Sequence, residues 1–155
     1  MTTDERFMLL AVEQAKLAYD AGEVPVGAVI VRGGEVIAAA YNTRESGKNA
    51  LYHAEVSAID AACKRLGGWR IPEATMYVTL EPCPMCAGAT INSRIDRIVY
   101  GAPDLRAGAF GSLFNLNDYP LNHKPEIVGG VLEEECAALL RSFFRRKREE
   151  QSRQD

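Results

Sequence analysis

Two short motifs in the chain hold residue types that can bind a metal ion. The triplet HAE opens at His53, and the pentapeptide PCPMC, with Cys83 and Cys86, follows after a stretch long enough for a helix and a strand. Zinc binds imidazole nitrogen and thiolate sulfur, and a catalytic zinc keeps three protein ligands so that water occupies the fourth position. His53, Cys83 and Cys86 supply three ligands, and Glu55 is near enough in sequence to exchange protons with that water. The motifs predict an open zinc site with a proton-carrying carboxylate.

Each motif alone has other interpretations. An isolated CxxC pair is also typical of a structural zinc site or a redox-active dithiol. A structural zinc needs a fourth protein ligand, for which His123, Cys63 and Cys136 are candidates, although both cysteines fall on apolar helical stripes where a buried small side chain is the simpler interpretation. A thioredoxin-like role leaves His53 and Glu55 without a function. Together the motifs favour a zinc-dependent nucleobase deaminase.

Composition fits a single globular domain. The chain has 155 residues, 47% of them hydrophobic and 25% charged, which is ordinary for a soluble protein. We expect one domain over residues 1–148 and a frayed tail over residues 149–155. The sequence shows neither a membrane-spanning apolar run nor a secretory or transit segment. A cytoplasmic protein without a membrane partner is therefore expected.

The charge is unevenly distributed along the chain. The net charge of −3 disfavours a nucleic-acid partner, but distribution matters more than the sum. Residues 141–148 (RSFFRRKR) form the basic end of a predicted amphipathic helix. This helix end is a candidate site for phosphates.

Hydrophobic periodicity predicts strands that alternate with helices. Helices are expected from Thr2 to about Gly22, over 52–66, from Cys83 to about Ser93, and from about residue 132 onward; strands are expected over 26–31, 35–41, 75–80, 97–100 and 126–128. The first two strands form an antiparallel pair, and the glycine-rich loop over 101–123 has the length of a binding segment. The metal ligands then lie at two helix starts, where unpaired N–H groups favour thiolates. The pattern predicts a layered α/β fold.

These motifs resemble those of the bacterial tRNA-specific adenosine deaminases of the cytidine deaminase superfamily. The likeness covers GEVPVGA at 22–28, residues 50–59, YVTLEPCPMCAGA at 77–89, residues 101–104 and 108–112, and ECAALLRSFF at 135–144. The zinc motif alone also fits cytidine, deoxycytidylate or guanine deaminases, and the last two stretches point to the tRNA branch. The resemblance implies a three-layer cytidine-deaminase-like fold with a central mixed five-stranded sheet flanked by helices. It also implies a homodimer, one zinc per subunit, and hydrolytic deamination of adenosine to inosine at the wobble position of a tRNA anticodon.

The resemblance also assigns roles around the zinc site. Asn42 matches the asparagine that hydrogen-bonds the target nucleoside, Val24 and Pro25 match the pocket wall, and Asp104 and Arg106 match positions near the RNA backbone and flanking nucleotides. The alternatives are a turn residue for Asn42, a turn-and-core role for Val24 and solvated loop charges for Asp104 and Arg106.

Four residues at the basic helix end are candidates for contacts with the RNA backbone: Phe144, Arg145, Arg146 and Arg148. The alternatives are a core role for the phenylalanine and a solvated face for the arginines. Tyr52 departs from the family, which has a small residue before the zinc histidine, and we expect it to alter how a neighbouring nucleotide packs.

Two competing functions stay open at this stage. A free-base or nucleoside deaminase, such as a guanine deaminase, needs no basic helix end and acts on a small substrate without RNA. A non-catalytic RNA-binding module stabilised by zinc has four protein ligands and keeps its function after Glu55→Ala.

Overall fold

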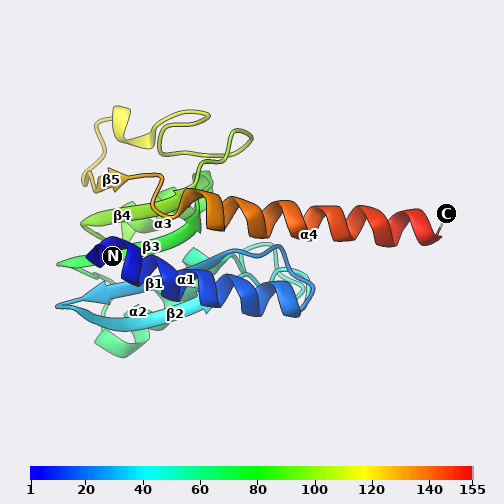
Figure 1. Ribbon diagram of the computed structural model, residues 1–155. Helices are drawn as coiled ribbons and strands as arrows, with labels where there is room; N and C mark the ends of the chain where they lie inside the picture. Colours follow the sequence, from blue (N-terminus) through cyan, green and yellow to red (C-terminus); the bar gives the residue numbers. More distant parts are fainter. Residues whose placement is uncertain (155) are drawn as a thin grey trace.

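A central five-stranded sheet organises the computed structural model, which describes residues 1–154 (Figure 1). In chain order the elements of this described part are α1 Thr3–Asp20, β1 Gly27–Arg32, β2 Glu35–Tyr41, α2 Ala54–Leu66, β3 Ala74–Leu80, α3 Pro84–Asn92, β4 Arg97–Ala102, the 3₁₀ turn η1 Leu116–Asp118, β5 Glu126–Val128 and α4 Glu133–Gln154. The mixed five-stranded α/β fold expected from the sequence is confirmed.

Strand directions bring several loops to one edge of the sheet. The strand order is β2-β1-β3-β4-β5; β1 is antiparallel to both β2 and β3, whereas β4 is parallel to β3 and β5. The carboxyl ends of β2, β3 and β4 therefore meet at the edge where β1 begins. In register, Gly27 pairs with Tyr41, and Leu80 pairs with Ala102. Ligands in open α/β sheets bind outside this kind of edge.

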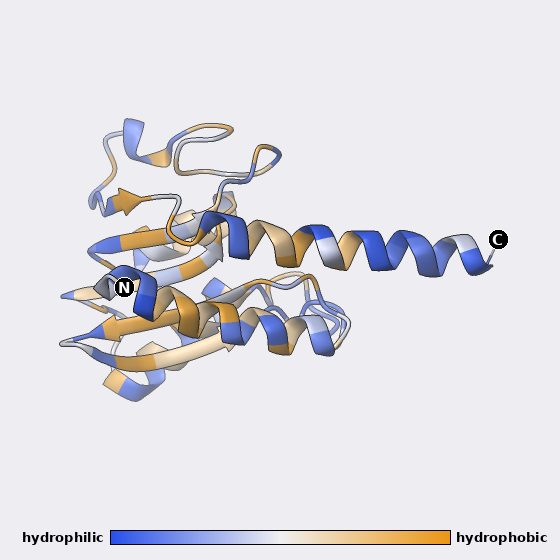
Figure 2. Ribbon diagram, in the orientation of Figure 1, coloured by the Kyte–Doolittle hydropathy of each residue, from blue (hydrophilic) through white to orange (hydrophobic). Residues whose placement is uncertain are grey.

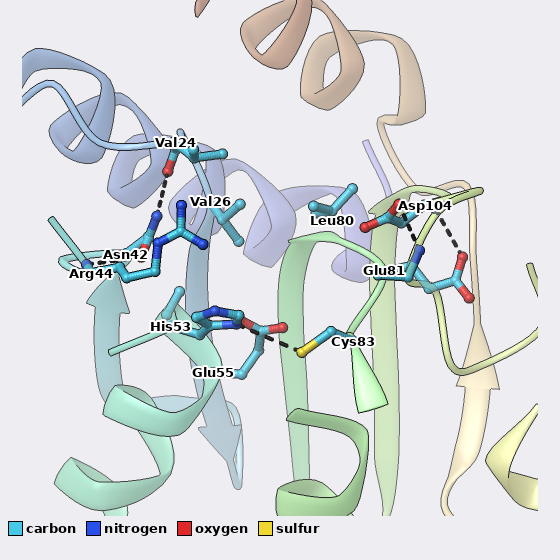
Figure 3. A pocket seen from close by; sticks show the side chains of 12 residues that line it. Val24, Val26, Asn42, Arg44, His53, Glu55, Leu80, Glu81, Cys83 and Asp104 are labelled. Carbon is cyan, nitrogen blue, oxygen red and sulfur yellow. Dashed lines mark hydrogen bonds between the residues drawn. The ribbon is translucent and has the colours of Figure 1, made fainter. Parts of the chain in front are cut away.

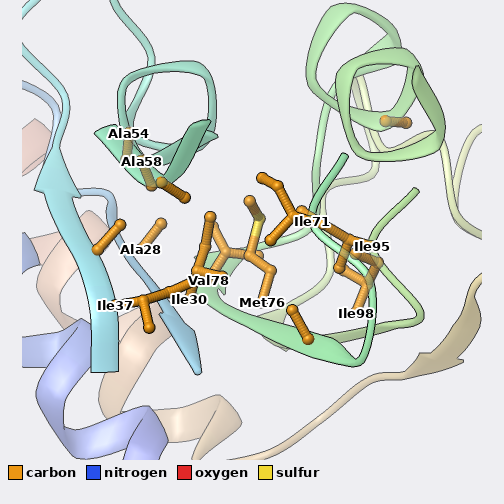
Figure 4. Close-up of a cluster of buried hydrophobic side chains, with 14 of the residues drawn as sticks. Ala28, Ile30, Ile37, Ala54, Ala58, Ile71, Met76, Val78, Ile95 and Ile98 are labelled. Carbon is orange, nitrogen blue, oxygen red and sulfur yellow. The ribbon is translucent and has the colours of Figure 1, made fainter. Parts of the chain in front are cut away.

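Helices cover both faces of the sheet. Alternate residues of β1 point to opposite sides, so Ala28 and Ile30 pack in the core beneath α2 and α3, while Val29 and Val31 pack with side chains of α1 and α4. Figure 4 shows the first of these cores, where small alanines of α2 lie over the larger aliphatic side chains of the strands. The result is a three-layer arrangement of helices, sheet and helices.

The termini of α1 and α2 are specified locally. Thr2 and Glu5 form a capping box at the start of α1, and Gly67, with φ 76°, ends α2 in the left-handed conformation. These signals lie within a few residues of each terminus, which is why the sequence locates these helices closely.

An ion pair ties the first helix to the sheet far from the site-bearing edge. Arg97 of β4 donates to both carboxylate oxygens of Asp4, at 2.8 and 2.7 Å, and the Tyr77 hydroxyl donates to the same carboxylate at 2.8 Å. The hydrogen bond from Arg97 lowers the pKa of Asp4. The pair is bidentate, which is the geometry in which an ion pair of arginine and carboxylate contributes to stability.

Helix α4 extends beyond the sheet. Its first half packs on the sheet and its hydrophilic second half projects away (Figures 1 and 2). The prediction of a frayed tail over 149–155 stays a prediction: residues 149–154 continue α4, and Asp155 lies outside the described residues. Over the described part of the chain, no helix combines the length and apolar character needed to cross a membrane.

Candidate metal centre and active site

His53, Cys83 and Cys86 converge on one point at the edge of the sheet. His53 Nδ1 lies 3.7 Å from Cys83 Sγ and 3.5 Å from Cys86 Sγ, and the three donor atoms lie within 4.8 Å of one another. A zinc ion at ordinary bond lengths and tetrahedral angles places such nitrogen and sulfur atoms about 3.6 Å apart. The donor set and its spacing therefore fit zinc.

Two helix starts present these ligands. His53 is the N-cap residue of α2 and Cys83 is the N-cap residue of α3; both have extended backbone, and neither side chain caps its helix. Pro84 begins α3, where a missing N–H has no cost. The imidazole and the thiol are thus free of the usual capping hydrogen bond and can bind a metal.

The local hydrogen bonds favour a thiolate at Cys83. A hydrogen bond from Cys86, and a second one from His53, lower the pKa of Cys83 to about 4. The hydrogen bond between His53 and Cys83 raises the pKa of His53. The hydrogen bond between Cys86 and Cys83, together with burial, raises the pKa of Cys86. Of the two thiols, Cys83 therefore ionises first.

Glu55 lies beside these ligands and is almost fully buried. It follows His53 in the first turn of α2, its exposed fraction is 4%, and it lines the same pocket as His53 and Cys83. Burial raises the pKa of Glu55 to about 7. The carboxylate is placed to exchange protons with a molecule in the pocket.

The candidates for a fourth protein ligand lie elsewhere. Cys63 Sγ is 3.7 Å from the carbonyl of Trp69, His123 Nε2 is 2.7 Å from the carbonyl of Ile95, and Cys136 is buried on the opposite face of the sheet. Among residues 1–154, the metal-binding cluster contains only His53, Cys83 and Cys86. The arrangement leaves a zinc position open toward the pocket.

The pocket over the ligands is small and has walls from several loops (Figure 3). Its volume is about 170 Å³, and Val24, Asn42 and Asp104 are among the residues that line it. Pro25 is buried and is not among the residues that line the pocket. Asn42 donates to the Val24 carbonyl (3.2 Å) and accepts from the Arg44 N–H (3.1 Å), which orients its amide and leaves one donor and one lone pair for a ligand.

A larger groove continues from the pocket. Its volume is about 1050 Å³, and it shares Val24, Arg44, Leu80 and Asp104 with the pocket. Four of the expected RNA-contacting residues line it: Arg106, Phe144, Arg145 and Arg148.

Arg146 points to a different neighbour. Its guanidinium lies 4.5 Å from the ring centre of Tyr19 and 3.6 Å from the Glu150 carboxylate, and it does not line the groove. The arginines of one helix turn thus have different environments.

Several residues of the site were not predicted from the sequence. Arg44 and Leu80 line both cavities, Leu105 lines the groove, and Glu81 holds the loop that carries Asp104. Leu105 lies between the assigned Asp104 and Arg106, and this position was a signal for it. Glu81 gave no signal because its hydrogen-bond partners are distant in sequence.

Comparison with known proteins decides the family. Residues 1–102 match the family model described as the cytidine and deoxycytidylate deaminase zinc-binding region. The chain belongs to this family.

Relatives place the deaminase more closely. It is 53% identical to the tRNA-specific adenosine deaminase of Bacillus subtilis (strain 168) over 149 residues, which cover 96% of this chain and 92% of the relative. A solved structure from work on A-to-I editing by tRNA deaminases at the wobble position superposes with a TM-score of 0.82 at 41% identity, covering 87% of this chain and 99% of the other. A guanine deaminase from Nitrosomonas europaea gives 0.75 at 26% identity, covering 90% and 83%. The deaminase therefore falls within the tRNA-specific adenosine deaminases.

We expect zinc content to distinguish the metal ligands from cysteines that do not bind the metal. The purified deaminase should hold about one zinc per chain. Cys86→Ser should hold almost none and Cys63→Ser should match the unmodified protein, because Cys86 belongs to the donor cluster and Cys63 does not. Elemental analysis after dialysis measures this. Equal zinc loss in Cys63→Ser would contradict a site with three protein ligands.

Proposed function

We propose that this deaminase converts adenosine to inosine at the wobble position of a tRNA anticodon. The observation that carries the proposal is the direct continuity between the small zinc-bearing pocket and a larger groove lined by arginines. A free base requires only the pocket, whereas a nucleotide within a chain also requires space and positive charge for its neighbours. The likeness to tRNA-specific adenosine deaminases supports the same substrate.

The chemistry divides between the metal and Glu55. Zinc held by His53, Cys83 and Cys86 supplies a Lewis acid that makes water a nucleophile near neutral pH. Glu55 takes a proton from the attacking water, delivers it to a ring nitrogen and assists the protonation of the departing amine. Water adds at C6 of adenine, the C–N bond breaks, ammonia leaves, and inosine remains. Asn42 orients the nucleoside through its remaining hydrogen-bonding groups.

The groove would receive the nucleotides on either side of the target. An anticodon loop is single-stranded, so its bases can be splayed out and read separately. Arg106, Arg145 and Arg148 line this groove and would contact phosphates, and the Phe144 ring, which is 45% exposed, would offer a surface on which a base can stack.

We also propose that the protein acts in the cytoplasm, where tRNA is used. We further propose that it is a homodimer. Several large apolar side chains of the loop after β4 are exposed, namely Leu113, Tyr119 and Leu121. A second copy of the chain is the occupant that we propose for this surface, and light scattering of the purified protein measures its mass directly.

An anticodon stem-loop with adenosine at the wobble position tests the proposed reaction. Incubation with the zinc-loaded protein should give inosine in the RNA, whereas guanine, cytidine and free adenosine should release no ammonia at a comparable rate. The reason is that only the RNA occupies both the pocket and the groove. Ammonia from a free base, with the RNA left unchanged, would overturn the proposal.

Glu55→Gln is the matched control for the same assay. The variant should keep its zinc, because Glu55 is not a ligand, and should lose roughly 10²–10⁴-fold in turnover, because the amide cannot carry a proton. Zinc content and single-turnover rates measure the two effects separately. A fully active Glu55→Gln protein would show that another group carries the proton.

Arginines in the second half of α4 provide a further prediction. Arg145→Ala and Arg148→Ala should weaken RNA binding and lower the slope of log Kd against log salt by roughly 0.7–1 each, because each removes a phosphate contact. Arg146→Ala should change the slope less, since this side chain stacks on Tyr19. Titrations at several salt concentrations measure these slopes, and an equal effect in Arg146→Ala would contradict the assignment.

A further inference from the structure

One buried carboxylate holds the loop that borders both the pocket and the groove. The loop over residues 103–112 contains no regular helix or strand, so other contacts must set its position. Glu81, which follows β3 and is only 1% exposed, points into this loop (Figure 3). Its carboxylate is therefore surrounded by loop backbone.

Both oxygens of this carboxylate accept hydrogen bonds from the loop. The Asp104 N–H donates to Oε1 at 3.1 Å, and the N–H groups of Phe110 and Ser112 donate to Oε2 at 3.1 Å each. The Ser112 hydroxyl donates a further, short hydrogen bond to Oε1. Four donors from both ends of the loop thus converge on one side chain.

These bonds extend from the zinc motif to the groove. Glu81 lies two residues before the ligand Cys83, and it binds the backbone of Asp104. The Asp104 carboxylate in turn accepts from the N–H groups of Arg106 (3.0 Å) and Ala107 (3.2 Å). Glu81 therefore connects the segment that binds the metal to the turn that carries Arg106.

Close packing leaves no freedom around the carboxylate. A Cβ atom at Gly108 would overlap the carboxyl group of Glu81 and the carbonyl oxygen of Asp104. Among the described residues, one backbone–backbone hydrogen bond joins the middle of this loop to the zinc motif. In it, the Ala109 N–H donates to the Pro82 carbonyl at 2.9 Å. The loop is wrapped directly around Glu81.

Only a carboxylate satisfies this set of donors. An ionised glutamate is an acceptor at both oxygens, whereas a glutamine has one acceptor oxygen and an NH₂ group. In Glu81→Gln, the NH₂ group would face N–H donors on one side of the loop. The side chain keeps its size in this variant but loses half of its accepting groups.

We propose that Glu81 is a positioning residue for RNA binding, which it supports by holding Asp104 and Arg106 in place relative to the metal site. This inference rests on the proposed function for its substrate. Glu81 also lines the pocket, but both of its oxygens accept from the backbone of the loop that borders the groove. The proposal therefore predicts an effect on RNA affinity that exceeds the effect on the chemical step.

The test compares Glu81→Gln with the unmodified protein and with Asp4→Asn, a control that weakens a partly buried hydrogen-bonded pair far from the loop. In Glu81→Gln, zinc content should be unchanged, and hydrogen exchange at the amides of Asp104, Phe110 and Ser112 should accelerate roughly tenfold or more. KM for the anticodon stem-loop should rise roughly tenfold, with kcat within about threefold. Asp4→Asn should leave loop exchange and KM unchanged.

Three results would overturn the proposal: unchanged loop exchange, a fall in kcat at constant KM, or an equal rise of KM in Asp4→Asn. If Glu81→Gln does not fold, Ser112→Ala decides, because it removes one donor and should shift loop exchange and KM in the same direction by a smaller factor. Loop exchange needs no RNA and no turnover. If the unmodified protein forms no inosine, the proposed function fails, while the exchange data still decide whether Glu81 holds the loop.

Discussion

The structure depends on bringing the N-termini of two helices to the same edge of one sheet. His53 and Cys83 occupy the N-cap positions of α2 and α3, where serine, threonine or aspartate usually stabilise a helix by about 1 kcal/mol each. Here the side chains make no capping bond and converge with Cys86 instead. Strand β1 runs antiparallel to its neighbours and so places the ends of β2, β3 and β4 at this edge. The metal site therefore depends on this sheet topology.

Buried carboxylates hold loops on opposite sides of the pocket. Glu81 accepts from the loop after β4, and Glu23 accepts from the N–H groups of Glu45 (3.0 Å) and Ser46 (2.7 Å) in the loop after β2. Burial acts to raise the pKa of Glu23, but the backbone hydrogen bonds outweigh it and lower the pKa. Both side chains are 1% exposed. Irregular loops can therefore form walls of defined shape because charged acceptors satisfy their backbone.

The sequence revealed the metal ligands because their spacing is local. Pro84 marks the helix start that carries the CxxC pair, and Gly67 marks the end of the helix that His53 opens. Strand patterns indicated the fold class. Contacts between residues far apart in the sequence could not be predicted from it. Arg145 and Arg146 are adjacent basic residues, yet only packing of α4 against Tyr19 separates their environments. Glu81 binds partners more than twenty residues away, and no periodicity encodes such a contact.

The coordination shell of the zinc-loaded protein tests the central claim most directly. X-ray absorption at the zinc edge should show two sulfur atoms at about 2.3 Å and two nitrogen or oxygen atoms at about 2.0–2.1 Å, which correspond to two cysteines, one histidine and one non-protein ligand. A shell with three sulfurs, or with two imidazoles, would mean that a fourth protein ligand closes the site. That result would contradict an open metal centre built from His53, Cys83 and Cys86.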